Sequence, residues 1–298
     1  YGNELGIEKV VWKRCLDLND RQLRRVNTGL SEESKIVPRL DGFDITVASE
    51  IMAVLCLSKN IQDLKNKISE IIVGYNIEKQ PIKVKDLNAQ GALTVLLKDA
   101  IKPNLVQTLE NNPCLVHGGP FANIAHGCNS IIATKMALKL GDYVVTEAGF
   151  GADLGAEKFL DIKCRKSGLK PDCVVCVATI KALKYHGGMA KEDIQNENIE
   201  ALIKGSKNIL KHIENIRKKF GLNVIVAINK YNTDSEKEIE FVQNELEKRK
   251  IMSSVVESWA KGGEGAIDIS NKIIEVAEKE TEFEYMYSLK ETIVEKIN

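Results

Sequence analysis

Short apolar runs alternate with amphipathic stretches along this 298-residue chain. Four runs rich in β-branched residues predict buried strands at 71–75, 142–146, 173–178 and 223–228. Because these runs are apolar on both faces of an extended chain, they predict parallel strands covered by helices. Apolar residues at helical spacing, or long charged stretches between strands, predict helices at 129–140, 197–220, 235–250 and 278–298.

The alternation of strands with helices predicts an α/β fold with a doubly wound, mostly parallel sheet and right-handed crossovers. A modest break near Gly221 predicts a second, smaller α/β domain, so the expected domains are 1–220 and 221–298. Several junctions between strands and helices are rich in glycine: 117–120, 148–152, 186–188 and 261–265. Ligands of open α/β sheets bind beyond the carboxyl ends of the strands. Glycine there lets backbone N–H groups approach an anion.

Charge and composition narrow the classes of partner. The chain has 42 basic and 42 acidic residues, so its formal charge is zero. No net positive field attracts nucleic acid or an anionic membrane surface. No apolar run of about 18 residues predicts a membrane span. We therefore expect small-molecule substrates, with no nucleic-acid or membrane partner.

The seven cysteines do not form a recognisable metal site. Cys173 and Cys176 have C-x-x-C spacing, but they lie in an apolar strand-like run and would point to opposite faces. No second pair completes a zinc site. We expect small buried thiols in a reducing compartment, and no bound metal.

The segment 116–130 carries two histidines, His117 and His126, in a glycine-containing loop that leads into a predicted helix. Such a loop presents backbone donors to a phosphate or carboxylate, with the histidines as candidate catalytic groups. The alternative is a tight loop whose histidines bond to backbone carbonyl groups. The residues alone leave both interpretations open.

The segment 145–159 combines acidic residues with an aromatic residue between glycines. Glu147, Asp153 and Glu157 are candidates to coordinate a hard cation such as Mg²⁺, and Glu147 and Asp153 are also candidates for catalysis. The alternative is that the acids cap a helix. Phe150, between Gly149 and Gly151, is placed to cover a flat ring.

Two aromatic residues follow later strand-like runs. Tyr231 lies in a segment like the guanine-reading N-K-x-D pattern, but Asp234 comes five residues after Asn229 rather than three. Trp259 precedes the glycine cluster at 262–265. Each aromatic is either a stacking surface or a packed rim residue. Lys181 and Lys184 are predicted to lie on a solvated helix face.

Two common signatures are absent from the 298 residues. The phosphate-binding pattern G-x-x-x-x-G-K-[ST] does not occur, and neither does the G-x-S-x-G pattern of α/β hydrolases. Residue chemistry alone therefore indicates an α/β protein with a site for an anion and a flat ring.

Several long motifs resemble one family. They are W-K-R at 12–14 with D-L-N-D-R at 17–21, G-F-D-I-T-V-A-S-E-I-M at 42–52, K-D-A-I-K-P-N-L-V-Q-T-L-E at 98–110, G-G-P-F-A-N-I-A-H-G at 118–127 and T-E-A-G-F-G-A-D-L-G at 146–155. From Trp12 to its end the chain resembles formate–tetrahydrofolate ligases, most closely the bacterial monofunctional type. It looks like the central portion of such an enzyme, without the N-terminal phosphate-binding loop and the C-terminal domain.

The resemblance implies a reaction and its ligands. Formate attacks the γ-phosphate of Mg²⁺-bound ATP to give formyl phosphate, and N10 of tetrahydrofolate then takes the formyl group. It also implies activation by a monovalent cation such as K⁺, a P-loop NTPase-like fold, a homotetramer and a cytoplasmic location. Residues 1–220 would belong to the nucleotide-binding domain and 221–298 to the folate-binding domain. This portion alone is expected to be inactive.

The resemblance also assigns roles to particular positions. Tyr231 (usually Phe in the family) and Trp259 match an aromatic pair that sandwiches the folate ring. Phe150, with its neighbours Gly149 and Gly151, matches a nucleotide-binding position. The candidate catalytic residues lie near the family's active cleft by resemblance, without individual steps: His117, His126, Glu147 and Asp153.

Two other interpretations stay open. One is a folate- or nucleotide-binding fragment without turnover, since the chain has no phosphate-binding loop. The other is a P-loop protein of the GTPase type, against which the wrong spacing of Asn229 and Asp234 counts.

Overall fold

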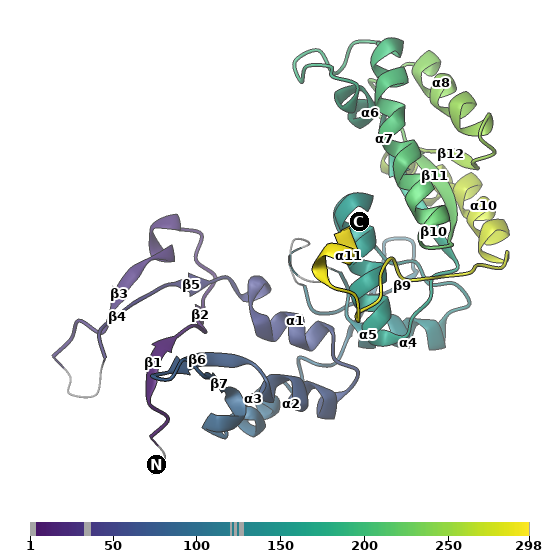
Figure 1. Ribbon diagram of the computed structural model, residues 1–298. Coiled ribbons are helices and arrows are strands. Elements are labelled where there is room, and N and C mark those ends of the chain that lie inside the picture. The colour runs from purple at the N-terminus through teal and green to yellow at the C-terminus, as the bar shows by residue number, and fades with distance from the viewer. Residues whose placement is uncertain (1–3, 33–36, 120, 122–123, 125–127, 298) are drawn as a thin grey trace. The chain divides into compact units, whose positions relative to one another are not determined.

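The computed structural model describes residues 4–32, 37–119, 121, 124 and 128–297 (Figure 1). Contacts divide the chain into two compact units, residues 1–167 and 168–298. Each unit is described by itself. Both combine helices and strands, so the predicted mixed α/β class is confirmed.

The first unit contains short strands in separate small sheets. Its elements are β1 (Ile7–Val10), β2 (Arg14–Cys15), β3 (Val26–Thr28), β4 (Arg39–Asp41), β5 (Phe43–Asp44), α1 (Glu50–Cys56), α2 (Ile61–Ser69), β6 (Ile72–Asn76), β7 (Pro81–Lys83), α3 (Gln90–Leu96), β8 (Asn104–Gln107), β9 (Pro113–Val116), α4 (Ile131–Leu140) and α5 (Arg165–Ser167). The sheet β1–β6–β7 is antiparallel. β3–β4 and β8–β9 are antiparallel pairs, and β2–β5 is a parallel pair.

A compact apolar core holds α1, α2, β6 and β7 together. Leu64 and Ile68 come from one face of α2 and are completely buried against Val73 and Ile82 of the sheet. Asn60 caps α2, because its side chain accepts the Asp63 N–H at 2.8 Å. The cap and the apolar stripe together explain why this stretch forms a helix at this position.

The second unit is built on three parallel strands. Its elements are β10 (Cys173–Ala178), α6 (Ile180–His186), α7 (Ile199–Lys218), β11 (Asn223–Asn229), α8 (Glu236–Glu247), β12 (Ser253–Val256), α9 (Ser258–Lys261), α10 (Ile267–Ala277) and α11 (Ile293–Ile297). The strand order is β10–β11–β12, with Ala178 opposite Ile228 and Asn229 opposite Val256 (Figure 1).

The central strand β11 is buried on both faces. Ile225 and Ala227 pack against Ile269 of α10. The alternate residues Val224 and Val226 are buried as well and face the other side, where α7 and α8 contact the sheet. The continuous apolar run therefore reflects a strand covered from both sides, as predicted.

Two predicted strands differ from the structure. Most of 71–75 does form a strand, β6 (Ile72–Asn76), but it pairs antiparallel with β1 and β7 instead of joining a parallel sheet. Residues 142–146 form no strand, and Val145 is exposed. A run of β-branched residues becomes a strand only where a partner strand accepts its hydrogen bonds, and none lies beside this run among the described residues.

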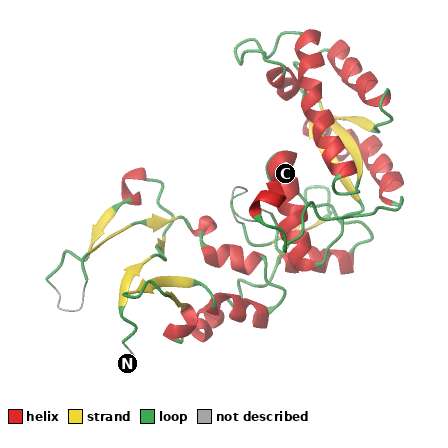
Figure 2. Cartoon of the chain, in the orientation of Figure 1, coloured by secondary structure: helices red, strands yellow, loops and turns green. Residues whose placement is uncertain are grey.

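The predicted terminal helix is also mostly wrong. Figure 2 shows loop along most of 278–292, and only Ile293–Ile297 forms a helix, α11. The Glu282 N–H donates to Gly221 O and the Glu284 N–H to Phe220 O. Aromatic and acidic residues alternate here, a pattern with a period of two that suits an extended segment.

The structure gives the chain no single doubly wound sheet, because its described strands are divided among several small sheets. The expected boundary near Gly221 lies between β10 and β11, which are hydrogen-bonded neighbours. Which of the parts 1–220 and 221–298 binds which ligand stays a prediction. In the part of the chain that is described, no helix combines the length and apolar character needed to cross a bilayer.

Candidate functional site

His117 lies buried at the end of β9, and both of its ring nitrogens have partners. Nδ1 is 2.6 Å from Ser130 Oγ, and Nε2 is 2.7 Å from Ala100 O. A carbonyl oxygen only accepts, so Nε2 carries a proton and donates to it. Ser130 Oγ also caps α4 by accepting the Ala133 N–H at 2.9 Å, and its hydroxyl proton is free to go to Nδ1.

This bonding pattern makes His117 a clamp between two segments. It ties the backbone at Ala100 to the first turn of α4, and it leaves neither ring nitrogen for a ligand. This geometry favours the alternative in which the loop is tight and its histidine bonds to groups within the protein. The second histidine of the loop, His126, lies outside the described residues.

The glycine loop at 148–151 makes a sharp turn into a helical segment. Gly149 has φ +67° and Phe150 has φ +35°. A large side chain rarely adopts a positive φ, so the backbone at Phe150 is strained. A Cβ on Gly155 would overlap Gly149 O, so only glycine allows the helix to approach the loop this closely. The result is an aromatic ring that is 63% exposed at the tip of a fixed turn.

Residues 152–164 after this loop are π-helical except at Glu157. This geometry is rare and often occurs at functional sites. Lys158 Nζ lies 6.0 Å from the Phe150 ring centroid and, within the described part of the chain, has no hydrogen-bond partner. Lys163 Nζ donates to Thr134 Oγ1 at 2.8 Å. Burial lowers the pKa of both ammonium groups.

Glu147 and Asp153 flank the Phe150 turn, and both are exposed. Among the residues that the structure describes, no group of three or more His, Cys, Asp and Glu side chains is arranged to hold a metal ion. A role of these acids in Mg²⁺ binding stays a prediction.

The second unit places three side chains at one edge of its sheet. Lys181 follows the end of β10 by three residues, Tyr231 follows β11 by two, and Trp259 follows β12 by three. The strands are adjacent and parallel, so their carboxyl ends meet at the same edge. This is where ligands bind in open α/β sheets. We call the three residues the edge site.

Tyr231 is held at its backbone and at its ring. Asp234 Oδ2 accepts the Tyr231 N–H at 2.8 Å, and Lys181 Nζ lies 4.6 Å from the ring centroid. The tyrosine is nevertheless 45% exposed. Asp234 is buried, and its Oδ1 has no hydrogen-bond partner in the described residues. Burial raises the pKa of this carboxyl group.

Trp259 lies in the short helix α9 and is 88% exposed. The turn around it is fixed by the Glu257 N–H, which donates to Gly265 O at 3.0 Å, and by an ion pair between Lys261 and Glu257. A Cβ on Gly265 would come too close to the Glu257 backbone. The glycine cluster therefore closes the turn and leaves the indole projecting into solvent.

Lys184 differs from its prediction. Instead of lying on a solvated face, it is fully buried and forms an ion pair with Glu238 Oε1 at 2.9 Å. Its Nζ also donates to Asn196 O at 2.9 Å. Glu238 Oε1 accepts the Asn198 N–H, so the pair joins α6, the start of α7 and α8. Both charges are desolvated behind the edge site.

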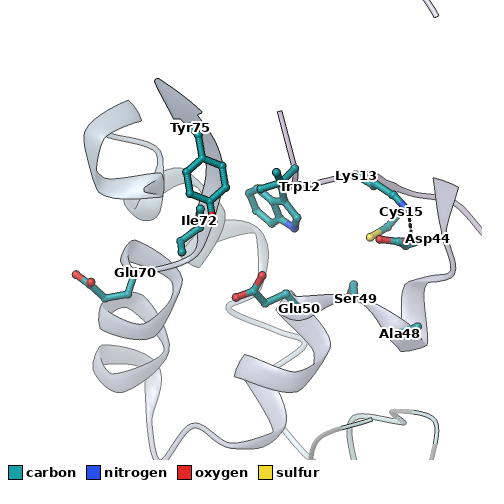
Figure 3. Close-up of a pocket in the computed structure, with 11 residues that line it drawn as sticks. Trp12, Lys13, Cys15, Asp44, Ala48, Ser49, Glu50, Glu70, Ile72 and Tyr75 are labelled. Carbon is teal, nitrogen blue, oxygen red and sulfur yellow. Dashed lines mark ion pairs between the residues drawn. The ribbon is translucent and has the colours of Figure 1, made fainter. Parts of the chain in front are cut away.

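A cavity of about 420 Å³ lies elsewhere, in the first unit (Figure 3). Trp12, Glu50 and Tyr75 are on its wall, and Lys13 pairs with Asp44 at its rim. None of the sequence-predicted site residues lines it. Its position therefore adds nothing to the candidate site.

The comparison with known families decides the identity. The profile of the formate–tetrahydrofolate ligase family matches residues 2–298. The chain belongs to this family. Formate–tetrahydrofolate ligases are enzymes of one-carbon metabolism that join formate to a folate.

The exposed aromatic rings can be compared with the ligand-binding positions expected of a formate–tetrahydrofolate ligase. The edge site contains Tyr231 and Trp259, the pair that the resemblance matches to folate, and the strained turn contains Phe150, which the resemblance matches to the nucleotide. These assignments stay predictions, but the structure brings the first two to one sheet edge. Lys158 and Lys181 are the neighbours that the sequence did not indicate as site residues. No motif marks either one, because each is defined by burial or by a ring contact.

Proposed function

We propose that this chain takes part in ATP-dependent formylation of tetrahydrofolate, giving ADP, phosphate and 10-formyltetrahydrofolate. Family membership supports the ligase class. The observation that carries the proposal within the structure is the edge site. Two exposed aromatic residues follow the carboxyl ends of adjacent parallel strands, where α/β sheets bind ligands.

The folate ring is proposed to bind at Tyr231 and Trp259. Both rings are exposed, and both lie on turns fixed by backbone hydrogen bonds. A rigid aromatic surface loses little conformational freedom when a flat ligand stacks on it. Tyrosine in place of the family's usual phenylalanine keeps the ring face and adds a hydroxyl group.

The nucleotide is proposed to contact Phe150, with Gly149 and Gly151 shaping the turn. The strained backbone at Phe150 supports this role, because such strain persists at ligand-binding positions when the surroundings enforce it. The buried ammonium of Lys158 adds positive charge behind the ring. Glu147 and Asp153 remain candidate catalytic groups near this turn. His126 remains a candidate on the sequence alone, whereas His117 is proposed as a structural clamp.

The proposed reaction has two steps. A formate oxygen attacks the γ-phosphorus of ATP, the bond to the β-phosphate oxygen breaks, and ADP leaves. N10 of tetrahydrofolate then attacks the formyl carbon, loses its proton and expels inorganic phosphate. The first step depends on positioning and on positive charge around the phosphates.

We propose that Mg²⁺ enters with ATP as its complex and that a monovalent cation such as K⁺ activates the enzyme. The phosphate-binding pattern is absent from these 298 residues, so we propose that turnover needs a phosphate-binding loop outside them. Residues 168–298 would then be part of a larger P-loop NTPase-like, doubly wound fold.

A cytoplasmic homotetramer is the proposed assembly. Apolar side chains on β8, β9 and α4 are exposed in the single chain, among them Leu105, Val116, Leu138 and Leu140. An apolar surface of this kind favours contact with another protein copy.

The test is a substrate-dependence assay on the complete polypeptide that contains these residues. We expect 10-formyltetrahydrofolate only when ATP, formate and tetrahydrofolate are all present. Nucleotide hydrolysis that ignores formate and folate would favour the GTPase-type alternative. Tight folate binding with no turnover in the complete chain would favour the binding-only alternative.

A further inference from the structure

Two of the three lysines on the segments around Tyr231 form ion pairs among the described residues. Lys184 pairs with Glu238, and Lys230 pairs with Glu236 at 2.7 Å. Lys181 forms neither an ion pair nor a hydrogen bond within the described residues; its ammonium lies over the Tyr231 ring, and its charge also acts on the Asp234 carboxyl group. An ammonium group over a ring face is attracted by the quadrupole of that ring.

The contact covers one face of the tyrosine. Lys181 Nζ stands 4.6 Å from the ring centroid, within the distance at which a cation is attracted to an aromatic face. Tyr231 is still 45% exposed, so part of its surface remains accessible to a ligand. Because Lys181 occupies one ring face, a flat ligand would stack on the other.

The ring and its backbone are anchored from different elements. Lys181 comes from the first turn of α6, whereas Asp234, which accepts the Tyr231 N–H, comes from the segment before α8. Lys184, one turn further along α6, is locked to Glu238 of α8 by the buried ion pair. The ion pair thus fixes the first turns of α6, which carry Lys181.

We infer that Lys181 is a positioning residue for folate: it holds the Tyr231 ring in place and reserves the opposite face for the pteridine ring. The inference rests on the proposed role of Tyr231 in folate binding. Lys181 acts through the tyrosine, with no direct contact to the ligand's carboxylates. A ring fixed before the ligand arrives lowers the ordering cost of binding.

The variant Lys181→Met keeps the length of the side chain and removes its charge, and Lys181→Arg restores a cation that also stacks on rings. In the complete chain we expect Lys181→Met to raise the Kd of tetrahydrofolate by about 3- to 30-fold, the range that corresponds to a cation–π contact. Lys181→Arg should recover most of the loss.

Two comparisons separate positioning from direct binding. Tetrahydropteroate lacks the glutamate carboxylates, and Lys181→Met should weaken it by the same factor as tetrahydrofolate. In a Tyr231→Leu background, Lys181→Met should have no further effect, because the residue through which it acts is gone. A loss confined to the glutamate-bearing ligand, or an equal loss in both backgrounds, would overturn the inference.

The outcome also distinguishes this inference from the proposed function. If the unmodified chain binds tetrahydrofolate and Lys181→Met binds it equally well, only the positioning role is wrong. If the unmodified chain does not bind tetrahydrofolate, the proposed function fails, and the positioning role fails with it.

Discussion

Burial controls the chemistry of the thiol groups in both units. Desolvation raises the pKa of Cys164 to about 12 and those of Cys56 and Cys176 to about 11. These side chains stay protonated at neutral pH and behave as small apolar groups. Cys15 and Cys114 are exposed, so the sequence-based expectation of buried thiols does not hold for the whole set.

Alkylation should separate the two groups. Iodoacetamide at about pH 8 should modify Cys15 and Cys114 in the folded protein, because only accessible thiolates react. The buried Cys56, Cys164 and Cys176 should react only after unfolding, and folate binding should survive the modification. Peptide mass mapping before and after denaturation checks this. Early modification of Cys164 would contradict the burial described here.

Asp234 gives the molecule a pH-dependent term in its stability. Burial raises its pKa, a backbone hydrogen bond from Tyr231 lowers it, and so do the charges of Lys181 and Lys184, whereas Glu238 raises it. Folding therefore disfavours the ionised carboxylate. The contribution to stability is most favourable below the pKa of the unfolded chain and is lost as the pH rises through the folded pKa.

The variant Asp234→Asn removes this titration. We expect the free energy of unfolding of the unmodified protein, relative to that of Asp234→Asn, to fall as the pH rises from acid towards neutral. Urea unfolding of both proteins across that range measures the difference. A relative stability that increases with pH would show that the carboxylate is stabilised by the fold.

At the scale of elements, α6 and α8 are joined by a buried ion pair. Lys184 and Glu238 are each almost fully buried, and their partners include backbone groups at the start of α7. Removing one partner of such a pair leaves an uncompensated charge in the interior, which costs about 3–5 kcal/mol. The pair therefore fixes the helix that carries Lys181.

Lys184→Met should lower the free energy of unfolding by about 3–5 kcal/mol. The matched control is Lys211→Met on α7, where Lys211 pairs with Glu214 on the surface and should contribute at most about 1 kcal/mol. Chemical denaturation of both variants measures the contrast. Equal losses would mean that the Lys184 pair is not buried in solution.

The sequence predicted the helices and strands that have strong local patterns. The prediction failed for segments whose structure depends on which other segments they pack against. The strands 173–178 and 223–228 and the helices α4, α7 and α8 have apolar periods or end caps that agree with their environment. The predictions for 142–146 and 278–298 were wrong for two reasons. A strand forms only beside a partner strand, and an extended segment can form hydrogen bonds with a part of the chain that is distant in sequence. No local pattern contains that information.

The candidate site shows the same division at the level of residues. Phe150 and Trp259 were indicated by their glycine-rich turns, Tyr231 by its place after a strand-like run, and all three by the resemblance. The burial of Lys184 and the ring contact of Lys181 were not, because both depend on residues distant in sequence, Glu238 and Tyr231. Helical lysines have the same pattern whether their partner is water or a carboxylate.

At the scale of the whole molecule, the two proposed ligand contacts lie in different compact units. Phe150 belongs to residues 1–167, and Tyr231 and Trp259 belong to residues 168–298. We therefore predict that nucleotide binding and folate binding depend on separable sets of side chains. All three aromatic side chains are exposed, so replacing any one of them should leave the core intact.

The most direct test is a pair of calorimetric titrations, with tetrahydrofolate and with ATP, on the complete chain and on Trp259→Ala and Phe150→Ala. Trp259→Ala should weaken tetrahydrofolate binding by about 1–3 kcal/mol, or about 5- to 150-fold in Kd, and leave ATP binding unchanged. Phe150→Ala should weaken ATP binding alone. An unchanged Kd for tetrahydrofolate in folded Trp259→Ala would contradict the proposed folate site, because tetrahydrofolate would then bind without the Trp259 side chain of the edge site.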